Sequence, residues 1–401
     1  MCNLRFLGAS FVAAAFLLLP SAARAQFSSG SDGSDGALNI TANTVLPVQE
    51  DGVHNYTTIN VGASATLSFK NNSRNTPVIF LATGDVTING AIDLRGDSGR
   101  SYGDPRAAQP GNEAVPGPGG FPGGLGAQPV INGGSGIGTS GGGPGGGQAA
   151  NDPSPDVNGR GRGGNAGSHF TAGAIGAANA NPAAPTYGDV RLLALSGGSG
   201  GAGANAVYGS PTTLHGSAGG AGGAAYQPTG EGSNAAGSGA GGAIRLMANS
   251  IEGTGALYAK GSAGGVAGGD GEVRLEALLI TGPSNIDVVP QSSIPSAVAL
   301  APGSQPTVRI TSIAGIAVPD PPTGSTATPD VTIPTATSNP IQIQMQTTNV
   351  PDGSTIHLRI VLGNGDILTV NSNPVASNAA TAEATLPKGV GVLYATATFG
   401  P

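Results

Sequence analysis

An internal repeat constrains the fold of this chain more than any other feature of its sequence. The segment Ile79–Gly96 aligns without a gap with the segment Ile244–Gly261. The matched pairs are mostly aliphatic residues at alternate positions and glycines at turns: Ile79 with Ile244, Leu81 with Leu246, Val86 with Ile251, Gly90 with Gly255, Ala91 with Ala256, Ile92 with Leu257, Arg95 with Lys260 and Gly96 with Gly261. A further copy lies 29 residues later and is carried by Val273, Leu275, Ile280 and Ile286.

A partial copy begins at Val190-Arg191-Leu192, and it shares an apolar-Arg-Leu triplet with Ile244-Arg245-Leu246 and Val273-Arg274-Leu275. Repeats of 27–29 residues that contain short strands and sharp turns are typical of a parallel β-solenoid. We expect the aliphatic side chains to point inward and stack between coils, each contributing roughly 1.5–3 kcal/mol. The Arg, Asp, Thr and Glu side chains between them are expected to face water.

Glycine dominates the middle of the chain, where residues 97–271 hold most of its 71 glycines. Such tracts can be flexible linkers, ordered loops or a bundle of polyproline II segments. Scattered larger residues such as Phe121, Ile131 and Tyr208 favour order. No strict three-residue period is kept, which excludes collagen and disfavours a regular bundle. We therefore expect ordered but irregular insertions at about 97–187 and 197–240 in a solenoid that spans residues 37–290.

The carboxy-terminal residues 307–401 lose the glycine excess and regain the alternation of strands. The strand candidates are Val308–Ile310, Ile341–Gln346, Ile356–Leu362, Ile367–Val370, Ala380–Leu386 and Val392–Phe399. Hairpin turns are indicated at Asn349–Gly353 and Gly363–Gly365. This pattern predicts a small immunoglobulin-like β-sandwich. Because a proline-rich linker, residues 291–306, precedes it, we expect an independent domain with few contacts to the solenoid.

The amino terminus has the pattern of a cleavable signal peptide over residues 1–25. Arg5 precedes the apolar run Phe6–Leu19, and Ala23-Arg24-Ala25 gives the small-x-small cleavage pattern. The run is shorter than the roughly 20 residues that span a bilayer, so no membrane span is expected after cleavage. The mature chain would begin with a polar leader, residues 26–36. We predict export to the extracellular space or the cell surface.

Composition excludes several functions. Cys2, inside the signal, is the sole cysteine, so the mature chain has no disulfide, no cysteine-bound metal and no thiol nucleophile. Loss of Arg5 and Arg24 would change the formal charge from −7 to −9. Charged residues make up 10% of the chain and form no basic patch, so we expect no nucleic-acid partner.

The best catalytic candidates are Asp93, Arg95 and Asp97, since parallel β-helix enzymes that act on polysaccharides gather acidic and basic side chains on one outer face. Lys260, Asp270 and Glu272 are weaker additions. However, Asp93 aligns with Tyr258 and not with an acid, so the repeat stacks no carboxylates. We interpret the trio as a solvated face and keep a polysaccharide lyase or hydrolase as the alternative function.

No cofactor or metal site is predicted. The histidines His54, His169, His215 and His357 lie in unrelated contexts and are expected at the surface or in loops. Gly268–Val273 is a single, off-pattern fragment of a calcium-binding repeat, so dependence on calcium stays open. Nucleotide-binding and Ser-His-Asp patterns are missing, because the many GxG matches follow from composition.

Three segments carry a resemblance to a known type of protein: Ser31–Leu38, Pro77–Gly90 and Gly242–Asn249. With the signal peptide, they make the chain similar to bacterial exported proteins that join a glycine-rich, right-handed parallel β-helix to a small β-sandwich, like the passenger domains of surface adhesins. The resemblance covers most of residues 31–290 and implies no assigned activity or catalytic residues. We therefore expect a structural or adhesive protein whose solenoid is a scaffold and whose sandwich binds or anchors. Cell-surface glycans or other surface proteins would be its partners.

Overall fold

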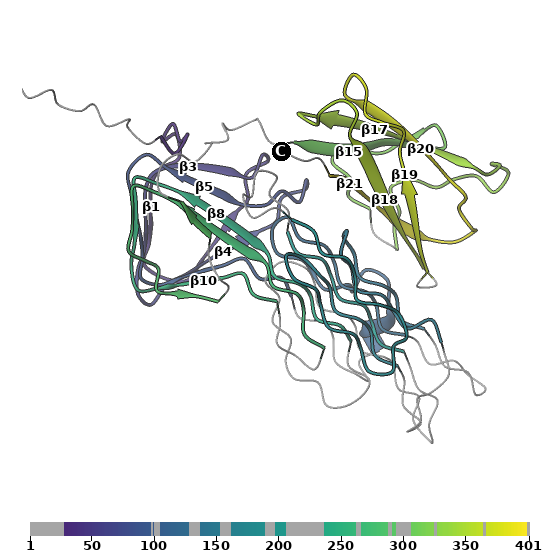
Figure 1. Ribbon diagram of the computed structural model, residues 1–401, viewed down its shortest axis with the longest axis horizontal. Coiled ribbons are helices and arrows are strands. Elements are labelled where there is room, and N and C mark those ends of the chain that lie inside the picture. Colours follow the sequence, from purple (N-terminus) through teal and green to yellow (C-terminus); the bar gives the residue numbers. More distant parts are fainter. Residues whose placement is uncertain are drawn as a thin grey trace, which may run out of the picture.

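The computed structural model describes residues 28–97, 99, 105–127, 137–152, 162–188, 197–205, 236–261, 266–287, 291–293, 306–324, 327–363 and 366–398. Within these ranges the regular structure is β, apart from one 3-10 turn at Pro105–Ala108. Parallel sheets occupy one part of the chain and antiparallel sheets another, and extended segments lie below them in the view of Figure 1.

Fourteen strands form two parallel sheets: β1 (Gly36–Ile40), β2 (Thr44–Pro47), β3 (Val53–Val61), β4 (Thr66–Lys70), β5 (Ile79–Ala82), β6 (Asp85–Ile88), β7 (Ala91–Asp93), β8 (Ala243–Met247), β9 (Ser250–Glu252), β10 (Ala256–Tyr258), β11 (Glu272–Glu276), β12 (Leu279–Ile280), β13 (Asn285–Ile286) and β14 (Gln291–Ser293). Strands β5 to β7 make one turn of the chain, β8 to β10 the next, and β11 to β13 the one after. Each strand pairs with its counterpart in the neighbouring turn. The predicted parallel stacking is confirmed and is consistent with a solenoid.

The repeat sets the register of the second and third strands of each turn. Val86 lies opposite Ile251, and Leu257 lies between Ile92 and Ile286. These aliphatic side chains share one core with their counterparts on the first strands. The twelve residues predicted to be buried are buried, except that Ile280 and Ile286 on the last turn are partly buried.

Strand β5 departs from the predicted register by one residue. Phe80, and not Leu81, lies opposite Leu246 and fills the core. Ile79 and Leu81 point to the outer side of the sheet, where they are buried with Met247 and Val53. The reason is spacing: Phe80 precedes Val86 by six residues, whereas Leu246 precedes Ile251 by five.

The glycine-rich region is inserted between two adjacent turns. Strands β5, β6 and β7 pair directly with β8, β9 and β10, so no coil lies between them in the stack. The partial repeat at residues 190–192 lies outside the described residues. The predicted insertions therefore belong to one excursion that starts after β7 and returns at β8.

The described parts of this excursion form a regular bundle of extended segments, which contradicts the irregular insertions that we expected. Their backbone hydrogen bonds recur at every third residue. Phe121, Gly124 and Ala127 donate to the carbonyl oxygens of Gly198, Gly201 and Ala204 at 3.1, 2.8 and 3.0 Å, and Gly200 and Gly203 donate to Gly142 and Thr139 at 3.1 and 2.9 Å. Three residues per turn is the period of the polyproline II helix. Figure 1 shows these segments side by side below the parallel sheets. We call them the glycine bundle.

The segment Gly197–Asn205 shows why the bundle needs glycine. A Cβ atom on Gly200 would collide with the carbonyl oxygen of Pro122, and one on Gly201 would collide with that of Gly237. The third face of the segment carries side chains, and Ser199, Ala202 and Asn205 are buried there. Of the other two faces of this extended helix, one is glycine throughout (Gly197, Gly200 and Gly203), and the second carries Gly198, Gly201 and the buried Ala204. The glycine content is thus a packing requirement.

The carboxy-terminal strands form two antiparallel sheets. They are β15 (Thr307–Ile313), β16 (Ile316–Ala317), β17 (Ile341–Thr348) and β20 (Ala379–Ala384) in one sheet, and β18 (Thr355–Leu362), β19 (Ile367–Asn371) and β21 (Gly391–Thr398) in the other. All six predicted strands are present, and β16 is an addition. Ile343 and Met345 of the first sheet share a core with Ile356 and Leu358 of the second. We call this pair of sheets the sandwich.

Gly200→Ala tests the packing of the glycine bundle. The added methyl group has no space beside Pro122, so we expect a loss of stability at or above the roughly 1–3 kcal/mol that is usual for overpacking. Thermal unfolding followed by circular dichroism measures it. Ala177→Val is the matched control, since it adds carbon at an exposed position of the same region. Equal stability of the two variants would contradict the bundle.

Candidate functional site

The predicted residues Asp93 and Arg95 lie together at the end of β7. The guanidinium of Arg95 donates from Nε to Oδ1 of Asp93 at 2.8 Å and from Nη2 to Oδ2 at 2.6 Å. It also lies 4.7 Å from the ring centre of Tyr258, the residue opposite Asp93 on β10. Its hydrogen bonds to Asp93 raise the pKa of Arg95. Both oxygens of Asp93 are therefore engaged, and the pair braces the outer side of the sheet.

Asp97 does not join this pair. It is exposed where the chain enters the excursion, and its backbone N–H donates to the carbonyl oxygen of Val115 at 2.8 Å. Among the described contacts, none involves its carboxylate. The weaker candidates are also dispersed. The backbone N–H of Lys260 donates to Oδ1 of Asp287 at 3.0 Å, and the backbone carbonyl oxygen of Asp270 accepts from the N–H groups of Phe170 and Thr171 at 3.1 and 3.2 Å. Among these predicted residues, the structure thus brings together one ion pair, Asp93 with Arg95, and no two carboxylates that face each other.

Charged residues are buried on the outer side of β8 and β11, where we expected them to face water. Arg245 is 1% exposed and lies opposite Arg274. Glu276, which is fully buried, accepts hydrogen bonds from Nη2 of Arg245 at 3.1 Å and from Nε of Arg274. Burial lowers the pKa of Arg245. The shared apolar-Arg-Leu triplet thus builds a buried ion cluster across neighbouring turns.

Glu272 begins β11 and is 2% exposed. Its Oε1 atom has no hydrogen-bond partner in the described structure. Burial raises the pKa of the carboxyl to about 7, against the opposing effect of Arg274. The group can therefore bind and release a proton near neutral pH, but no second carboxyl faces it.

Glu272→Gln tests this burial. The folded carboxyl has a pKa of about 7, above its ordinary value of 4.5, so the unfolded chain releases this proton first as the pH rises. The carboxyl therefore costs stability above pH 4.5, and the cost is complete above pH 7. We expect the variant to unfold at a higher temperature than the wild type at pH 8, with this advantage lost at pH 4. Glu252→Gln, at an exposed position, is the control; an equal gain there would refute the assignment.

Two histidines are buried, contrary to the expectation of surface or loop positions. His54 lies among the rings of Tyr56, Phe69 and Phe80 at 5.9, 5.3 and 6.3 Å. Nδ1 of His169 lies 2.7 Å from the carbonyl oxygen of Gly241. Burial lowers the pKa of both, for His169 to about 4, so His169 is neutral at pH 7. His357 is exposed and bonded to Asn371, and His215 lies outside the described residues. In the described ranges, no three His, Cys, Asp or Glu side chains are placed to hold a metal.

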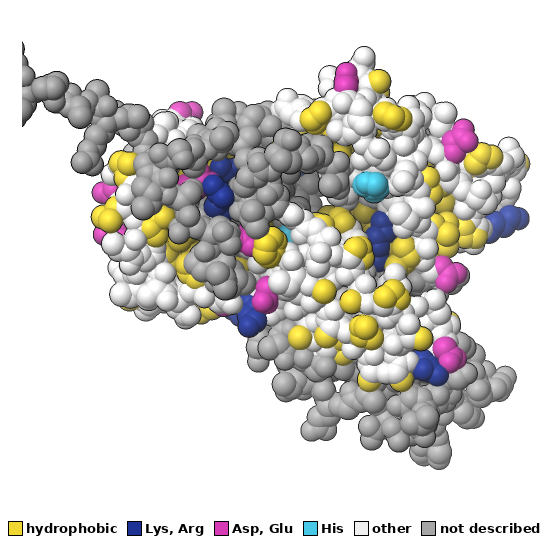
Figure 2. Space-filling model, in the orientation of Figure 1, with side chains coloured by type: hydrophobic (Ala, Val, Ile, Leu, Met, Phe, Trp, Pro, Cys, Tyr) yellow, Lys and Arg dark blue, Asp and Glu magenta, His cyan; other side chains and the backbone are white. Residues whose placement is uncertain are grey.

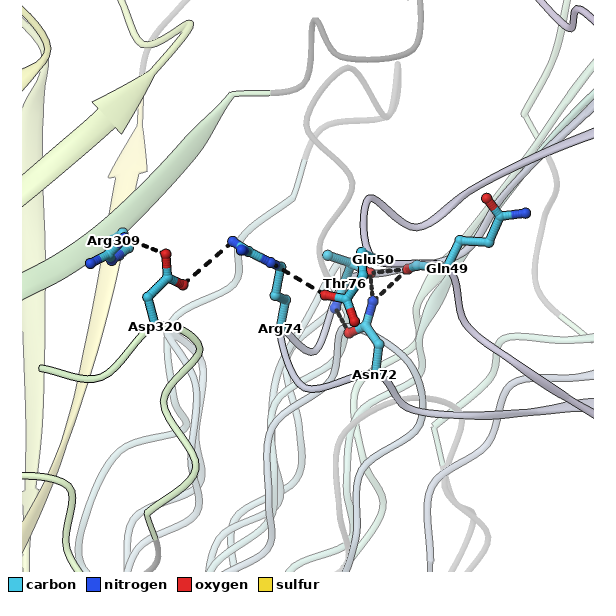
Figure 3. Close-up of polar contacts among 7 residues, drawn as sticks. All are labelled: Gln49, Glu50, Asn72, Arg74, Thr76, Arg309 and Asp320. Carbon is cyan, nitrogen blue, oxygen red and sulfur yellow. Dashed lines mark hydrogen bonds and ion pairs between the residues drawn. The ribbon is translucent and has the colours of Figure 1, made fainter.

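The sandwich contacts the parallel sheets through a chain of ion pairs (Figure 3). Arg74 lies 3.3 Å from Glu50, and on its other side 3.5 Å from Asp320, which also pairs with Arg309 of β15. Asn72 braces the Arg74 loop by donating to the hydroxyl of Thr76 at 2.6 Å. These charged groups are partly exposed, so each pair contributes about 0–1 kcal/mol.

A second contact joins the sandwich to the glycine bundle and is partly buried. Arg359 of β18 donates from Nη1 to the carbonyl oxygen of Gly141 at 2.7 Å and from Nη2 to that of Gly146 at 3.1 Å. Tyr394, opposite Arg359 on β21, packs edge-on against Phe121 with 5.4 Å between ring centres. Burial lowers the pKa of Arg359 to about 10. We expected few contacts here, but the sandwich places a half-buried arginine into the turn of the bundle.

A cleft of about 260 Å³ lies at the same junction. Ser140, Gln148 and Asn151 of the bundle line one side, and Asp366, Ile367 and Leu368 at the start of β19 line the other. Sequence reasoning missed it because its two walls lie about 200 residues apart and neither wall carries a motif.

Charged side chains are not concentrated on the face drawn in Figure 2, where the acidic and basic side chains of the described residues are scattered. None of the described helices has the length and hydrophobicity that a bilayer crossing needs. Comparison with protein-family models, with curated proteins and with solved structures finds no match.

Arg359→Ala tests the docking of the sandwich. The variant leaves the carbonyl oxygens of Gly141 and Gly146 without their donor, so we expect the sandwich to loosen from the bundle. Limited proteolysis should then cut the segment before β15 at least about threefold faster than in the wild type, as local opening becomes less costly. Arg309→Ala, at a partly exposed pair, is the control. An unchanged cleavage rate in Arg359→Ala would show that docking does not depend on this contact.

Proposed function

We propose that the chain is an exported, non-enzymatic scaffold with an adhesive module. In this proposal the parallel sheets form a right-handed β-helix and the antiparallel sheets an immunoglobulin-like sandwich that binds surface glycans or surface proteins. The observation that carries the proposal is the docked sandwich. Arg359 and Tyr394 fix it against a bundle that is itself inserted into the stack, so the stack positions a second module.

The outer polar side chains of the stack support a structural role for it. Asn39, Asn60, Thr87 and Glu252 form one column across β1, β3, β6 and β9. Asn60 donates to Asn39 at 2.9 Å, and Thr87 donates to Glu252 at 3.1 Å. Polar groups that satisfy one another hold adjacent turns together and leave few reactive groups on this face.

The location outside the cell rests on the signal-peptide pattern of residues 1–25. Three further features suit an environment in which redox conditions and ionic strength vary. The surface is weakly charged, the mature chain has no thiols, and backbone hydrogen bonds hold the frame.

Beads coated with the chain from Gln26 onward test adhesion on panels of immobilised polysaccharides and cell-surface preparations. We expect saturable adhesion to at least one preparation and a loss of about tenfold in Arg359→Ala, because multivalent contact amplifies small losses of affinity. Arg95→Ala, which removes an arginine from the stack, should adhere like the wild type.

The same preparations test the enzymatic alternative. If the wild type releases soluble oligosaccharides and Asp93→Asn does not, the chain is a polysaccharide-active enzyme. Failure of the wild-type beads to adhere to any preparation would also overturn the proposal.

A further inference from the structure

We infer that His54 is an acid-sensitive switch at the amino-terminal end of the stack, and that its protonation releases residues 28–35 from β3. We call these residues the leader segment. This role goes beyond the proposed function and does not rest on it. The position of the ring, the groups that face it and the bonds beside it support the role.

His54 is 2% exposed and shares the inner side of β3 with Tyr56. The rings of Tyr56, Phe69 and Phe80 surround it. Its Nδ1 lies 3.4 Å from the Tyr56 hydroxyl, and its Nε2 has no hydrogen-bond partner in the described structure. A neutral imidazole can leave one nitrogen as a bare acceptor. An imidazolium has two N–H donors to satisfy and a charge to solvate, and this site provides for neither.

The titratable groups that face His54 are Asp35 in the leader segment, Asp51 in the loop before β3 and Tyr56 on the same strand. Among the described residues, β4 and β5 present aromatic rings to it. The two carboxylates favour the charged ring, but burial outweighs them and lowers the pKa of His54. Burial also raises the pKa of Tyr56 to about 12, so its hydroxyl carries no compensating charge. A proton on His54 therefore favours a state in which the ring reaches water.

The leader segment is bonded to β3 at the two residues that follow His54. Oδ2 of Asp35 accepts from the backbone N–H of Asn55 at 2.6 Å, and the N–H of Asp35 donates to the carbonyl oxygen of Asn55 at 2.8 Å. The Ser31 hydroxyl donates to the carbonyl oxygen of Tyr56 at 2.9 Å. On its other edge, β3 pairs with β5 inside the stack. Local opening takes the least stable contacts first, so the leader segment leaves before β3 does.

Release also changes what the end of the stack presents. Opening frees the backbone N–H and carbonyl oxygen of Asn55, which Asp35 holds in the closed state. Unpaired backbone groups on an edge strand can pair with another chain. Acid thereby turns a covered strand edge into an open one.

Protonation favours release because the ring titrates at its ordinary value of 6.5 once it reaches water and at a lower pH while it is buried. The opened state therefore binds the proton first as the pH falls. The closed leader segment has its full stability well above pH 6.5 and loses stability below it. From pH 7.5 to pH 5, a single group of this kind raises the opening equilibrium by at most roughly thirtyfold.

Hydrogen exchange in the full mature chain measures the opening. Rates for the leader segment are corrected for the intrinsic effect of pH and referenced to the amides of β17 in the sandwich. We expect exchange at pH 5 to be about three- to thirtyfold faster than at pH 7.5. His54→Phe keeps an aromatic ring among aromatic rings and does not titrate, so its ratio should stay near one. His357→Gln, at an exposed histidine of the sandwich, should keep the wild-type ratio.

Ser31→Ala separates the fastening of the leader segment from the titration. Loss of one hydrogen bond should speed exchange about three- to tenfold at both pH values and leave their ratio unchanged. A wild-type ratio of one, or the same ratio in wild type and His54→Phe, overturns the inference, because the rings then hold the charged imidazole without opening. If His54→Phe does not fold, an NMR titration of the His54 ring in the wild type decides. Protonation of the ring without faster exchange of the leader segment overturns the inference, whereas the two occurring together support it.

Discussion

Direct hydrogen bonding between the backbones of glycine-rich segments is the interaction on which the rest of this structure depends. In the glycine bundle, extended segments approach so closely that a Cβ atom on Gly200 or Gly203 would overlap a neighbouring carbonyl oxygen. Glycine loses more conformational entropy on folding than other residues, so such a bundle forms only when its hydrogen bonds are made together. The bonds at every third residue provide that cooperativity, and the sandwich then has a rigid surface on which to dock.

The stack of parallel sheets accommodates this bundle at little cost. Strands β5 and β8 pair directly with each other, although about 160 residues separate them in the sequence. Loop-closure entropy grows only with the logarithm of loop length, so a long excursion costs little more than a short one. The excursion leaves the stack at the end of β7 and returns at β8, and pairing fixes both strands in the stack, β7 to β10 and β8 to β5.

The parts of the fold that the sequence predicts are those in which side chains alternate. The register of Val86 and Ile251 can be read from the sequence because polar residues flank both. Phe80 and Leu81 are both apolar, so the sequence does not show which of them faces the core of β5. The bundle was harder to predict, because the contact faces of a segment such as Gly197–Asn205 consist almost entirely of glycine, and a nearly uniform run of glycine hides the period of three. The candidate site shows the same limit. The partners of Arg359 are carbonyl oxygens, which every residue has, so no pattern connects it with Gly141.

A comparison of the buried Arg245 with the half-buried Arg359 shows why the junction suits a docked module. Arg245 has a carboxylate partner, since its Nη2 donates to Oε1 of Glu276 at 3.1 Å. Arg359 has carbonyl partners that do not titrate, and its pKa of about 10, though lowered by burial, still keeps it charged at neutral and acidic pH. The hydrogen bonds to Gly141 and Gly146 therefore persist wherever the bundle is folded. At this contact, docking of the sandwich then depends on the geometry of a glycine turn and on no carboxylate.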